Sequence, residues 1–294
     1  MPSLKDLKVR INSVKSTQKI TKAMKMVAAA KLRRARENAE NARPFAERME
    51  RMVTTLASKI TDVENASPLM VGTGNDHTHL LVVATADRGL CGGFNGSIVK
   101  SARVRARQLI ADGKEVKIFT VGKKSREMLK SELGSRIVAH VQDLTKGKLT
   151  FDKAELVVDK ILGMYDRGEF DVCHVVYNLF KSPILQVVTY QQLIPLALDT
   201  ANTDVAATDD SVYEFEPDEE AILDDLLPRN LKVQILKALL ENSASEQGAR
   251  MTAMDNATRN AGEMIDSLTL QYNRSRQAAI TKELIEIISG AEAL

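Results

Sequence analysis

The sequence predicts an α/β protein in which a long antiparallel coiled coil, formed by the N- and C-terminal helices, carries an inserted domain of alternating strands and helices. Residues 1–60 contain no glycine and repeat apolar side chains at helical spacing. Residues 210–294 show a similar spacing, whereas residues 76–198 alternate apolar runs with amphipathic stretches. Because this middle segment is too long for a hairpin loop, we expect it to fold as a domain inserted between the two strands of the coil.

The N-terminal coiled-coil helix, expected over residues 1–60, is rich in good helix formers and starts after Ser3, whose hydroxyl suits an N-cap. Its apolar residues recur at intervals of three and four, with a shift of phase after Val14. They are Leu4, Leu7, Ile11, Val14, Ile20, Met24, Val27, Met49, Met52, Leu56 and Ile60. This spacing gives a narrow apolar seam, which is typical of a helix paired with another helix. A shift of phase changes the local supercoil without breaking the helix.

The C-terminal coiled-coil helix, expected over residues 210–294, is predicted to pair with residues 1–60. Pro217 and Pro228 are expected near its start, where proline is tolerated, and Gly290 is expected to end it. Its apolar side consists of Leu227, Leu231, Ile235, Ala238, Leu239, Ile265, Leu268, Tyr272, Leu284 and Ile287. The two ends of the chain therefore predict one antiparallel coiled coil.

The middle segment, residues 76–198, is expected to be an open three-layer, Rossmann-like α/β domain. Its apolar runs predict strands at 79–85, 115–121, 137–141, 172–180 and 184–190. Its amphipathic stretches predict helices at 95–111, 123–133 and 151–167. Only a short turn containing Ser182 and Pro183 separates the last two strands, which predicts a hairpin and a mixed sheet.

Composition excludes several classes of protein. Hydrophobic residues make up 44% and charged residues 27% of the 294-residue chain, which fits a folded protein rather than a disordered one. No run approaches the ~18 consecutive apolar residues of a membrane span, and the first residues lack the apolar core of a secretory signal. Cys91 and Cys173 do not form a CxxC motif, so we expect neither a disulfide scaffold nor a zinc site, and a reducing compartment is the default.

The glycine-rich turn at residues 87–96 is the best candidate for chemistry. It follows a predicted strand and precedes a predicted helix, where doubly wound folds bind phosphates. Its spacing does not match GxGxxG, however, and residues 122–125 lack the first glycine of a Walker A motif. A tight turn is the alternative. Cys91 has no base partner in the sequence pattern, and the 4 histidines are scattered. We therefore predict no catalytic residue, no cofactor and no metal.

The net charge of +2 conceals an uneven distribution. Residues 1–59 carry 15 Lys and Arg against 5 Asp and Glu, whereas residues 199–225 carry 11 acidic residues and no Lys or Arg. Five basic residues of the first segment share one side of the helix: Lys8, Lys15, Lys19, Lys22 and Arg33. This basic stripe is either a solvated face, a contact with an acidic protein surface, or a contact with nucleic acid, and the lack of interleaved aromatic residues disfavours the last.

Three stretches together resemble one protein family. Residues 8–29, KVRINSVKSTQKITKAMKMVAA, resemble the start of the gamma subunit of rotary F-type ATP synthases. Residues 280–293, ITKELIEIISGAEA, resemble that family's C-terminal signature, and residues 87–93 resemble a turn of its central domain. The resemblance extends over essentially the whole chain.

This resemblance implies a central stalk that is not itself catalytic. In the family, the coiled coil lies inside a hexamer of alternating alpha and beta subunits, with one copy per hexamer. The α/β domain lies against the ring of c subunits beside the epsilon subunit. The stalk couples rotation of the c-ring to conformational cycling of the catalytic beta subunits. The resemblance implies no nucleic acid partner and contact with the membrane only through the c-ring. We expect a peripheral location on the cytoplasmic face of a bacterial inner membrane, or alternatively a mature organellar form.

The resemblance also implies roles for individual residues. Contact with a beta subunit is implied for Lys19, Lys22, Met24, Lys25, Arg276, Gln277 and Thr281. Contact with the c-ring and epsilon is implied for Tyr213, Glu214 and Glu216. A smooth apolar tip in its bearing is implied for Ile285, Ile287, Ile288 and Leu294.

Two alternative functions remain open on the residues alone. One is a nucleotide-dependent α/β enzyme that uses the turn at residues 87–96. The other is a basic coiled-coil protein that binds nucleic acid, which demands a steep dependence of binding on salt.

Overall fold

The computed structural model describes residues 3–59, 67–196 and 219–292. The chain divides into two compact units. Unit 1 consists of Met1–Ala30 and Arg250–Leu294, and unit 2 consists of Lys31–Ala249. Helices α1 (Leu4–Lys59) and α7 (Glu219–Glu292) contribute residues to both units. Within those described ranges, no helix is both long and apolar enough to cross a membrane.

The first helix begins as the sequence predicts. The hydroxyl of Ser3 accepts a hydrogen bond from the backbone N–H of Asp6 at 3.2 Å, and the Asp6 carboxylate accepts one from the backbone N–H of Ser3 at 3.1 Å. This reciprocal pair is a capping box, which satisfies two backbone donors that the first helical turn leaves without partners. The hydrogen bonds from Ser3 lower the pKa of Asp6.

Helix α1 has one uninterrupted seven-residue repeat, so the predicted shift of phase is wrong. Its buried and half-buried side chains continue in the same register from Leu7 to Leu56. In unit 1 these side chains are Leu7, Ile11, Val14, Gln18, Thr21, Lys25 and Ala28. Ile20 and Val27, which the sequence placed in the seam, are 60% and 55% exposed. The prediction was wrong because polar residues (Gln18, Thr21 and Lys25) occupy three seam positions. The apolar residues Ile20 and Val27 each lie one position before a seam residue and point outward.

In unit 1 the polar seam positions pair α1 with α7 in antiparallel order. The hydroxyl of Thr258 donates a hydrogen bond to that of Thr21 at 2.8 Å, and the Lys25 ammonium lies 2.6 Å from the Asp255 carboxylate. The amide of Gln18 donates to the backbone carbonyl of Thr258 at 3.5 Å. Hydrogen bonds at fixed levels of a coiled coil specify its register, which purely apolar layers do less well.

Three expectations for α7 need correction. The helix begins at Glu219, so Pro228 lies inside it rather than near its start, and it continues through Gly290 to Glu292. Leu284 and Ile287 are exposed rather than part of the seam. Pro217 and Ile60 lie outside the described residues.

Unit 2 contains a mixed five-stranded sheet in the order β3-β2-β1-β4-β5. The strands are β1 (Thr78–Ala84), β2 (Glu115–Val121), β3 (Ile137–Val141), β4 (Val172–Phe180) and β5 (Gln186–Ile194). All neighbours are parallel except β4 and β5, which form the predicted hairpin. Strand β5 starts later than expected, because residues 182–185 form the turn, where Ile184 is 85% exposed.

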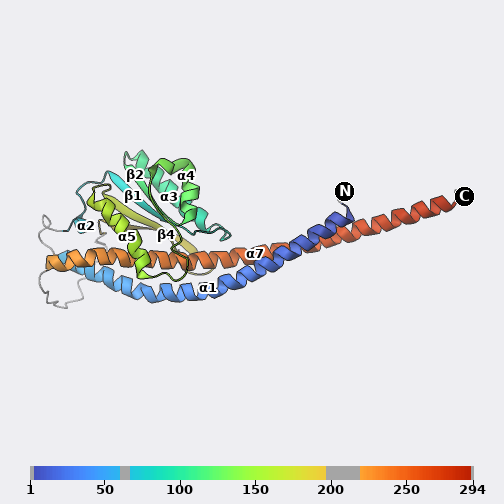
Figure 1. Cartoon of the computed structure of the whole chain (residues 1–294), viewed down its shortest axis with the longest axis horizontal. Helices are drawn as coiled ribbons and strands as arrows, with labels where there is room; N and C mark the ends of the chain where they lie inside the picture. Colours follow the sequence, from blue (N-terminus) through green and yellow to red (C-terminus); the bar gives the residue numbers. More distant parts are fainter. Residues whose placement is uncertain (1–2, 60–66, 197–218, 293–294) are drawn as a thin grey trace. The chain divides into compact units, whose positions relative to one another are not determined.

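Helices cover both faces of this sheet, which confirms the three-layer α/β prediction (Figure 1). Helices α3 (Phe94–Ala111) and α4 (Lys123–Leu133) pack on one face, around side chains such as Leu81 and Ile98. Helix α5 (Phe151–Asp166) and part of α7 pack on the other face, around Phe119 and Ile161. Short helices α2 (Pro68–Val71) and η1 (Gly134–Arg136) complete the described elements.

Helix α7 is part of the core of the α/β domain as well as a strand of the coil. Leu231, Ile235, Ala238 and Leu239 belong to the same apolar cluster as Phe119 of β2. The helix is therefore buried on more than one side in this region, between the sheet and α1. This explains why the narrow seam predicted for residues 210–294 does not describe its unit 2 portion.

Candidate functional site

In the glycine-rich turn after β1, the carboxylate of Asp87 binds the surrounding hydrogen-bond donors. Asp87 accepts hydrogen bonds from the backbone N–H of Lys123 at 3.0 Å and from that of Asp143 at 3.1 Å. It also accepts one from the hydroxyl of Thr145 at 3.2 Å. The amide N–H of Lys123 belongs to the first turn of α4, where a helix offers donors to an anion. At the carboxyl ends of β1, β2 and β3, Asp87 therefore occupies donors that a phosphate would need.

Close backbone packing at the same edge leaves little room beside β1. A Cβ atom at Gly122, whose φ is +93°, would lie 2.3 Å from the backbone oxygen of Thr85. The hydroxyl of Thr85 accepts a hydrogen bond from the backbone N–H of Ser125 at 2.7 Å, and Asn95 accepts one from that of Ala86 at 2.9 Å. These contacts support the interpretation of this region as a tight turn.

Cysteines and histidines do not assemble into a reactive site in the described part of the chain. Cys91 and Cys173 are both buried, and burial raises the pKa of the Cys173 thiol, which disfavours the thiolate. Among those residues no group of three His, Cys, Asp or Glu side chains could hold a metal ion. His79 and His174 stack within unit 2, with ring centroids 6.0 Å apart.

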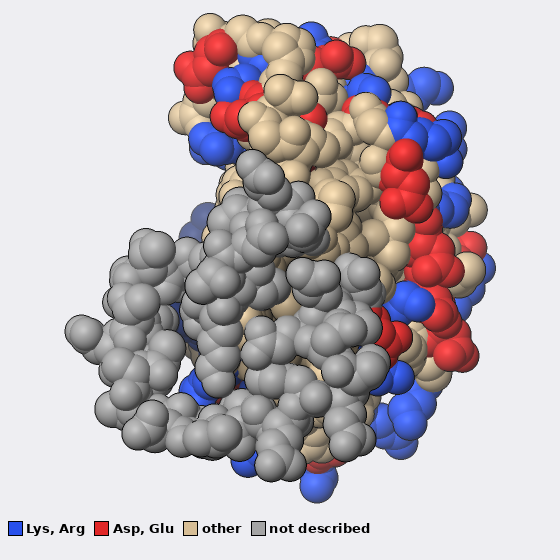
Figure 2. Space-filling view, turned by 90° about the vertical axis from the view of Figure 1, so that its left-hand side faces the viewer, with Lys and Arg blue, Asp and Glu red and all other residues tan. Residues whose placement is uncertain are grey.

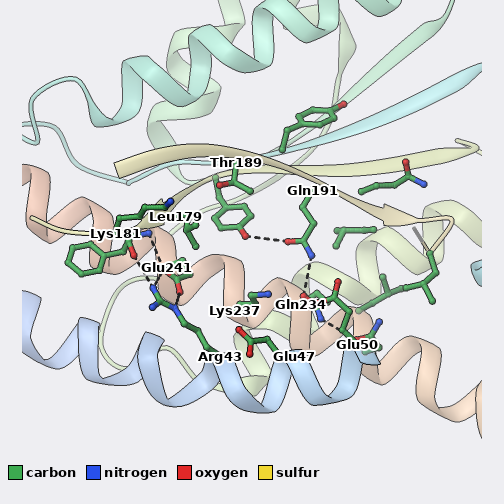
Figure 3. A pocket seen from close by; sticks show the side chains of 18 residues that line it. Arg43, Glu47, Glu50, Leu179, Lys181, Thr189, Gln191, Gln234, Lys237 and Glu241 are labelled. Atoms are coloured by element: carbon green, nitrogen blue, oxygen red, sulfur yellow. Dashed lines mark hydrogen bonds and ion pairs between the residues drawn. The ribbon is translucent and has the colours of Figure 1, made fainter. Parts of the chain in front are cut away.

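Buried polar side chains gather where α1, α7 and β4 meet in unit 2 (Figure 3). The carboxylate of Glu241, which is fully buried, accepts hydrogen bonds from Arg43 Nε at 2.5 Å and Arg43 Nη2 at 3.0 Å. It also accepts one from the backbone N–H of Phe180 at 3.0 Å, and Arg43 Nη2 donates to the carbonyl of Phe180 at 2.9 Å. The bond to Glu241 raises the pKa of Arg43.

A cavity of about 860 Å³ lies beside this cluster, between β5 and α1. A chain of hydrogen bonds crosses its wall from the sheet to α1. Tyr177 donates to the Gln191 side chain at 3.3 Å, Gln191 donates to Gln234 at 3.2 Å, and Gln234 donates to the carbonyl of Ala46 at 3.3 Å. Burial raises the pKa of Tyr177 to about 12, so its hydroxyl stays a neutral donor. These hydrogen bonds link Tyr177, Gln191 and Gln234 to α1 across one wall of the cavity.

The residues implied to contact a beta subunit lie in unit 1 and are mostly exposed. Lys19 and Lys22 are exposed on α1, as are Arg276, Gln277 and Thr281 on α7. The hydroxyl of Thr281 donates to the carbonyl of Gln277 one turn earlier at 3.0 Å.

Two of the implied contact residues are less exposed than the others. Met24 is half-buried, and Lys25 is half-buried in its ion pair with Asp255. Lys25 therefore already has an anionic partner within unit 1, which distinguishes it from Lys19 and Lys22.

The remaining implied residues lie at the chain's end or beyond the description. Ile285, Ile287 and Ile288 are all exposed. Tyr213, Glu214, Glu216 and Leu294 lie outside the described residues, as does much of the acidic segment at 199–225.

The basic stripe predicted on α1 is exposed along its length. Its members Lys8, Lys15, Lys19, Lys22 and Arg33 are all accessible. The neighbouring outward strip of α1 in unit 1 is exposed but uncharged, and consists of Val9, Ser13, Ser16, Ile20, Ala23, Val27 and Ala30. By contrast, the face drawn in Figure 2 mixes charges of both signs. On α1, Lys8, Lys15, Lys19 and Lys22 thus lie next to an exposed uncharged strip, whereas Arg33 pairs with Glu37.

Comparison with known proteins identifies the family. The family model described as ATP synthase matches residues 3–294. The ATP synthase gamma chain of Rhizobium etli is 60% identical over 294 residues, which cover 100% of both chains. The chain belongs to the ATP synthase gamma chain family. The gamma chain of Paracoccus denitrificans is likewise 60% identical over 294 residues, with 100% of both chains covered.

Solved structures agree with this family. A chain from the central stalk and c-ring of Tetrahymena thermophila mitochondrial ATP synthase matches with a TM-score of 0.60 and 28% identity. The match covers 81% of this chain and 99% of that one. A chain from Euglena gracilis mitochondrial ATP synthase has the same fold, with a TM-score of 0.69 at 18% identity. The match covers 99% of this chain and 94% of that one.

Membership in the family confirms the resemblance seen in the sequence. The two alternatives, a nucleotide-binding enzyme and a nucleic-acid-binding coiled coil, are not supported. Gamma chains are subunits of an ATP synthase complex.

The cluster around Glu241 is not among the residues that the sequence pattern predicts. One signal was present in the sequence, because residues 241–246 read ENSASE where the predicted helix needs apolar residues. Gly248 was a second signal. A Cβ there would lie 3.2 Å from Pro183 Cα and 3.3 Å from a ring carbon of Phe180, so the glycine allows α7 to pass close to the β4–β5 hairpin.

Proposed function

We propose that this chain is the central-stalk rotor subunit of a proton-translocating ATP synthase. In this role it couples rotation of the membrane c-ring to conformational cycling of the catalytic beta subunits. The observation that carries the proposal is the pairing of α1 and α7 in a chain of the gamma chain family. Two helices joined along one narrow seam leave their outer surfaces free for a surrounding partner, while the same helices anchor an α/β domain.

The proposed role is mechanical, and the chain itself is not catalytic. Asp87 supports this part of the proposal, since its carboxylate holds the donors at the strand ends where doubly wound folds bind phosphate. ATP would form on the beta subunits. No cofactor is required by this role.

The proposed contact with the beta subunits uses both helices of unit 1. On α1 it involves Lys19, Lys22, Met24 and Lys25, and on α7 it involves Arg276, Gln277 and Thr281. Exposed lysines attract an acidic partner surface over a distance and with little directional preference. The uncharged strip beside them forms no ion pairs that rotation would have to break.

Further contacts are proposed for the two ends of the rotor. Tyr213, Glu214 and Glu216 would meet the c-ring and the epsilon subunit, and Ile285, Ile287, Ile288 and Leu294 would form the apolar tip in its bearing. We propose one copy per hexamer of alpha and beta subunits. The complex would lie on the cytoplasmic face of a bacterial inner membrane, or in an organelle as a mature form, with membrane contact only through the c-ring.

Reconstitution tests the proposed function. The purified chain should show no ATPase activity by itself, and it should restore rotation-linked ATP hydrolysis when it is mixed with alpha and beta subunits. It should also co-purify at one copy per hexamer, as quantified by mass measurement of the intact complex. Hydrolysis by the isolated chain, or a hexamer whose activity is indifferent to it, would refute the proposal.

A further inference from the structure

Strand β4 is longer than its parallel neighbour. Strand β1 pairs with β4 only as far as Val83 and Val176, and β1 ends at Ala84. Strand β4 continues to Phe180, and its other edge pairs with β5 along that whole length. The backbone groups of residues 178 and 180 on the β1 side therefore have no strand beside them.

Polar side chains of α7 take the place of the missing strand. Asn242 accepts a hydrogen bond from the N–H of Asn178 at 3.1 Å, and Ser245 donates one to the carbonyl of Asn178 at 3.0 Å. Glu241 accepts from the N–H of Phe180 at 3.0 Å. Asn242 also donates to the carbonyl of Ala84, the last residue of β1, at 3.2 Å. All three side chains are buried.

Arg43 extends the same arrangement to α1. Its guanidinium contacts both Glu241 oxygens and the carbonyl of Phe180, and Figure 3 shows Arg43 and Glu241 pointing toward each other. Helix α1, helix α7 and strand β4 are thus joined pairwise at one point. We call Arg43, Glu241, Asn242 and Ser245 the β4 clamp.

We propose that the β4 clamp is the joint that transmits torque between the α/β domain and the two shaft helices. The proposal rests on the rotor function proposed above. Apolar contacts such as those of Leu231 and Ile235 hold the domain on α7, but they have no preferred direction and tolerate sliding. Hydrogen bonds weaken steeply when their angle departs from linear, and those to charged groups are the strongest. The clamp therefore fixes the angle of the sheet about the helix axis.

Burial makes this joint stiff as well as specific. Glu241 is 0% exposed, so a rotation that pulled it from Phe180 or Arg43 would leave a charge without water or a partner. The nearby ion pair of Lys232 with Glu155 also links α7 to the domain, at 2.6 Å, but Glu155 is partly solvated. Water can therefore replace Lys232 at Glu155 during a twist, whereas in the clamp it reaches the partly exposed Arg43 side chain but not the Glu241 carboxylate.

Single-molecule rotation of the assembled complex tests the proposal. The hexamer is fixed through its beta subunits, and a rotational probe is attached through an introduced cysteine at one of two exposed positions of unit 2. Lys130→Cys places the probe on α4 of the α/β domain, and Arg33→Cys places it on the shaft helix α1. Angular fluctuations at a catalytic pause report the torsional stiffness between the probe and the hexamer.

The main variant is Arg43→Met with Glu241→Gln, which removes both charges and keeps a neutral acceptor for the Phe180 N–H. We expect about a twofold loss of stiffness at the domain probe, because the charge-assisted bonds are lost, and no change at the shaft probe. Ser245→Ala should act in the same direction with a smaller loss. Val157→Ala is the control, since it creates a cavity under α5 without touching the clamp. It should lower the melting temperature and leave both stiffness values unchanged.

Equal stiffness of the double variant and the parent at the domain probe would overturn the proposal, as would a parallel loss at the shaft probe. If the double variant does not assemble, the Ser245→Ala variant is used instead: unchanged stiffness at its domain probe, or an equal loss at its shaft probe, would overturn the proposal. Failure of the rotor function would look different, because neither probe would then rotate in the parent complex.

Discussion

At the scale of single residues, Gly122 shows how closely the strand ends of unit 2 approach one another. It has a positive φ, and the Thr85 backbone oxygen lies where its side chain would begin. Both the backbone conformation and the close contact strongly disfavour any other residue. The sequence alone presents Gly122 only as part of an incomplete phosphate-binding motif, because the approach of β1 to the turn after β2 is a tertiary fact.

Gly122→Ala should therefore destabilise unit 2 by about 2–4 kcal/mol, from strain of the backbone together with the displaced Thr85. Urea unfolding of the purified chain would measure the loss. Gly113→Ala is the matched control, since Gly113 also has a positive φ but has open space around it. It should cost only about 1 kcal/mol. Equal losses in the two variants would show that the close contact is unimportant.

His174 of β4 is a buried base whose surroundings oppose a positive charge. Burial lowers its pKa to about 4, and the positive charges of His79 and Arg105 act in the same direction. Its ring stacks on Tyr190 at 4.4 Å, and the Arg105 guanidinium lies 5.3 Å from that tyrosine ring. Asp76, which also binds Lys114, lies 2.7 Å from His79 and partly opposes the effect of burial on the His79 pKa.

This histidine should make the chain sensitive to mild acid. The unfolded chain binds a proton at His174 near pH 6.5, and the folded chain does not do so until about pH 4. Its contribution to stability is thus complete above pH 6.5 and is lost as the pH falls toward 4. We expect a decrease of about 2 kcal/mol in the free energy of unfolding between pH 7 and pH 5. Urea unfolding at several pH values measures it.

His174→Phe should flatten this pH dependence, because the aromatic ring remains but cannot be protonated. Val138→Gln, at an exposed position of β3, changes no titratable group and serves as the control, so it should keep the slope of the parent chain. An unchanged slope in His174→Phe would assign the acid sensitivity to other groups.

At the scale of helices, the repeat of α1 shows that burial does not follow hydrophobicity alone. Positions 11 and 20 of this helix are both isoleucine, yet Ile11 is 8% exposed and Ile20 is 60% exposed. The seven-residue register places Gln18 and Thr21 inward on either side of Ile20. Their hydrogen bonds to Thr258 offset the cost of placing polar groups there.

The same substitution at these two positions should therefore have different effects. Ile11→Ala should destabilise the coiled coil by about 2–4 kcal/mol, because it leaves a cavity in the seam. Ile20→Ala should change stability by less than about 0.5 kcal/mol in the isolated chain. Thermal loss of helical circular dichroism would compare them. A larger loss of stability at Ile20 than at Ile11 would show that Ile20 lies in the seam, as the apolar pattern predicts.

Regular elements were largely predictable from the sequence, because local patterns determine them. Strand β2 occupies residues 115–121 as expected, and α4 occupies residues 123–133. Strand β5 was displaced because Ile184 and Leu185 are apolar but lie in an exposed turn. The β4 clamp could not be predicted, since it depends on how far β4 extends beyond β1, and the paired residues of these two strands are 93 positions apart in the chain.

At the scale of the whole molecule, the charged residues are distributed unevenly over the surface. The net charge is only +2, but the stripe lysines Lys8, Lys15, Lys19 and Lys22 place exposed positive charges along α1, whereas Arg33 is paired with Glu37. Such charges attract an acidic surface over about 8 Å at physiological ionic strength. Lys25 contributes less to it than sequence suggests, because Asp255 neutralises it.

Reversing two stripe charges tests this role. Lys19→Glu with Lys22→Glu should change stability by less than about 0.5 kcal/mol, since both side chains are exposed. It should nevertheless lower the ratio of protons pumped to ATP hydrolysed in the reconstituted synthase. Arg126→Glu with Lys130→Glu, which reverses two exposed charges on α4, should keep that ratio. Normal coupling in the Lys19 and Lys22 variant would mean that the stripe is only a solvated surface.

Asp87 has a consequence for the whole complex. A domain that holds a phosphate at its strand ends gains stability by mass action, so its stability rises and falls with the concentration of that ligand. Here the anion is part of the chain, and its effective concentration beside Lys123 and Asp143 is constant. We therefore expect the stability of this domain not to depend on the concentration of ATP, which would suit a shaft in a complex whose substrate and product are nucleotides.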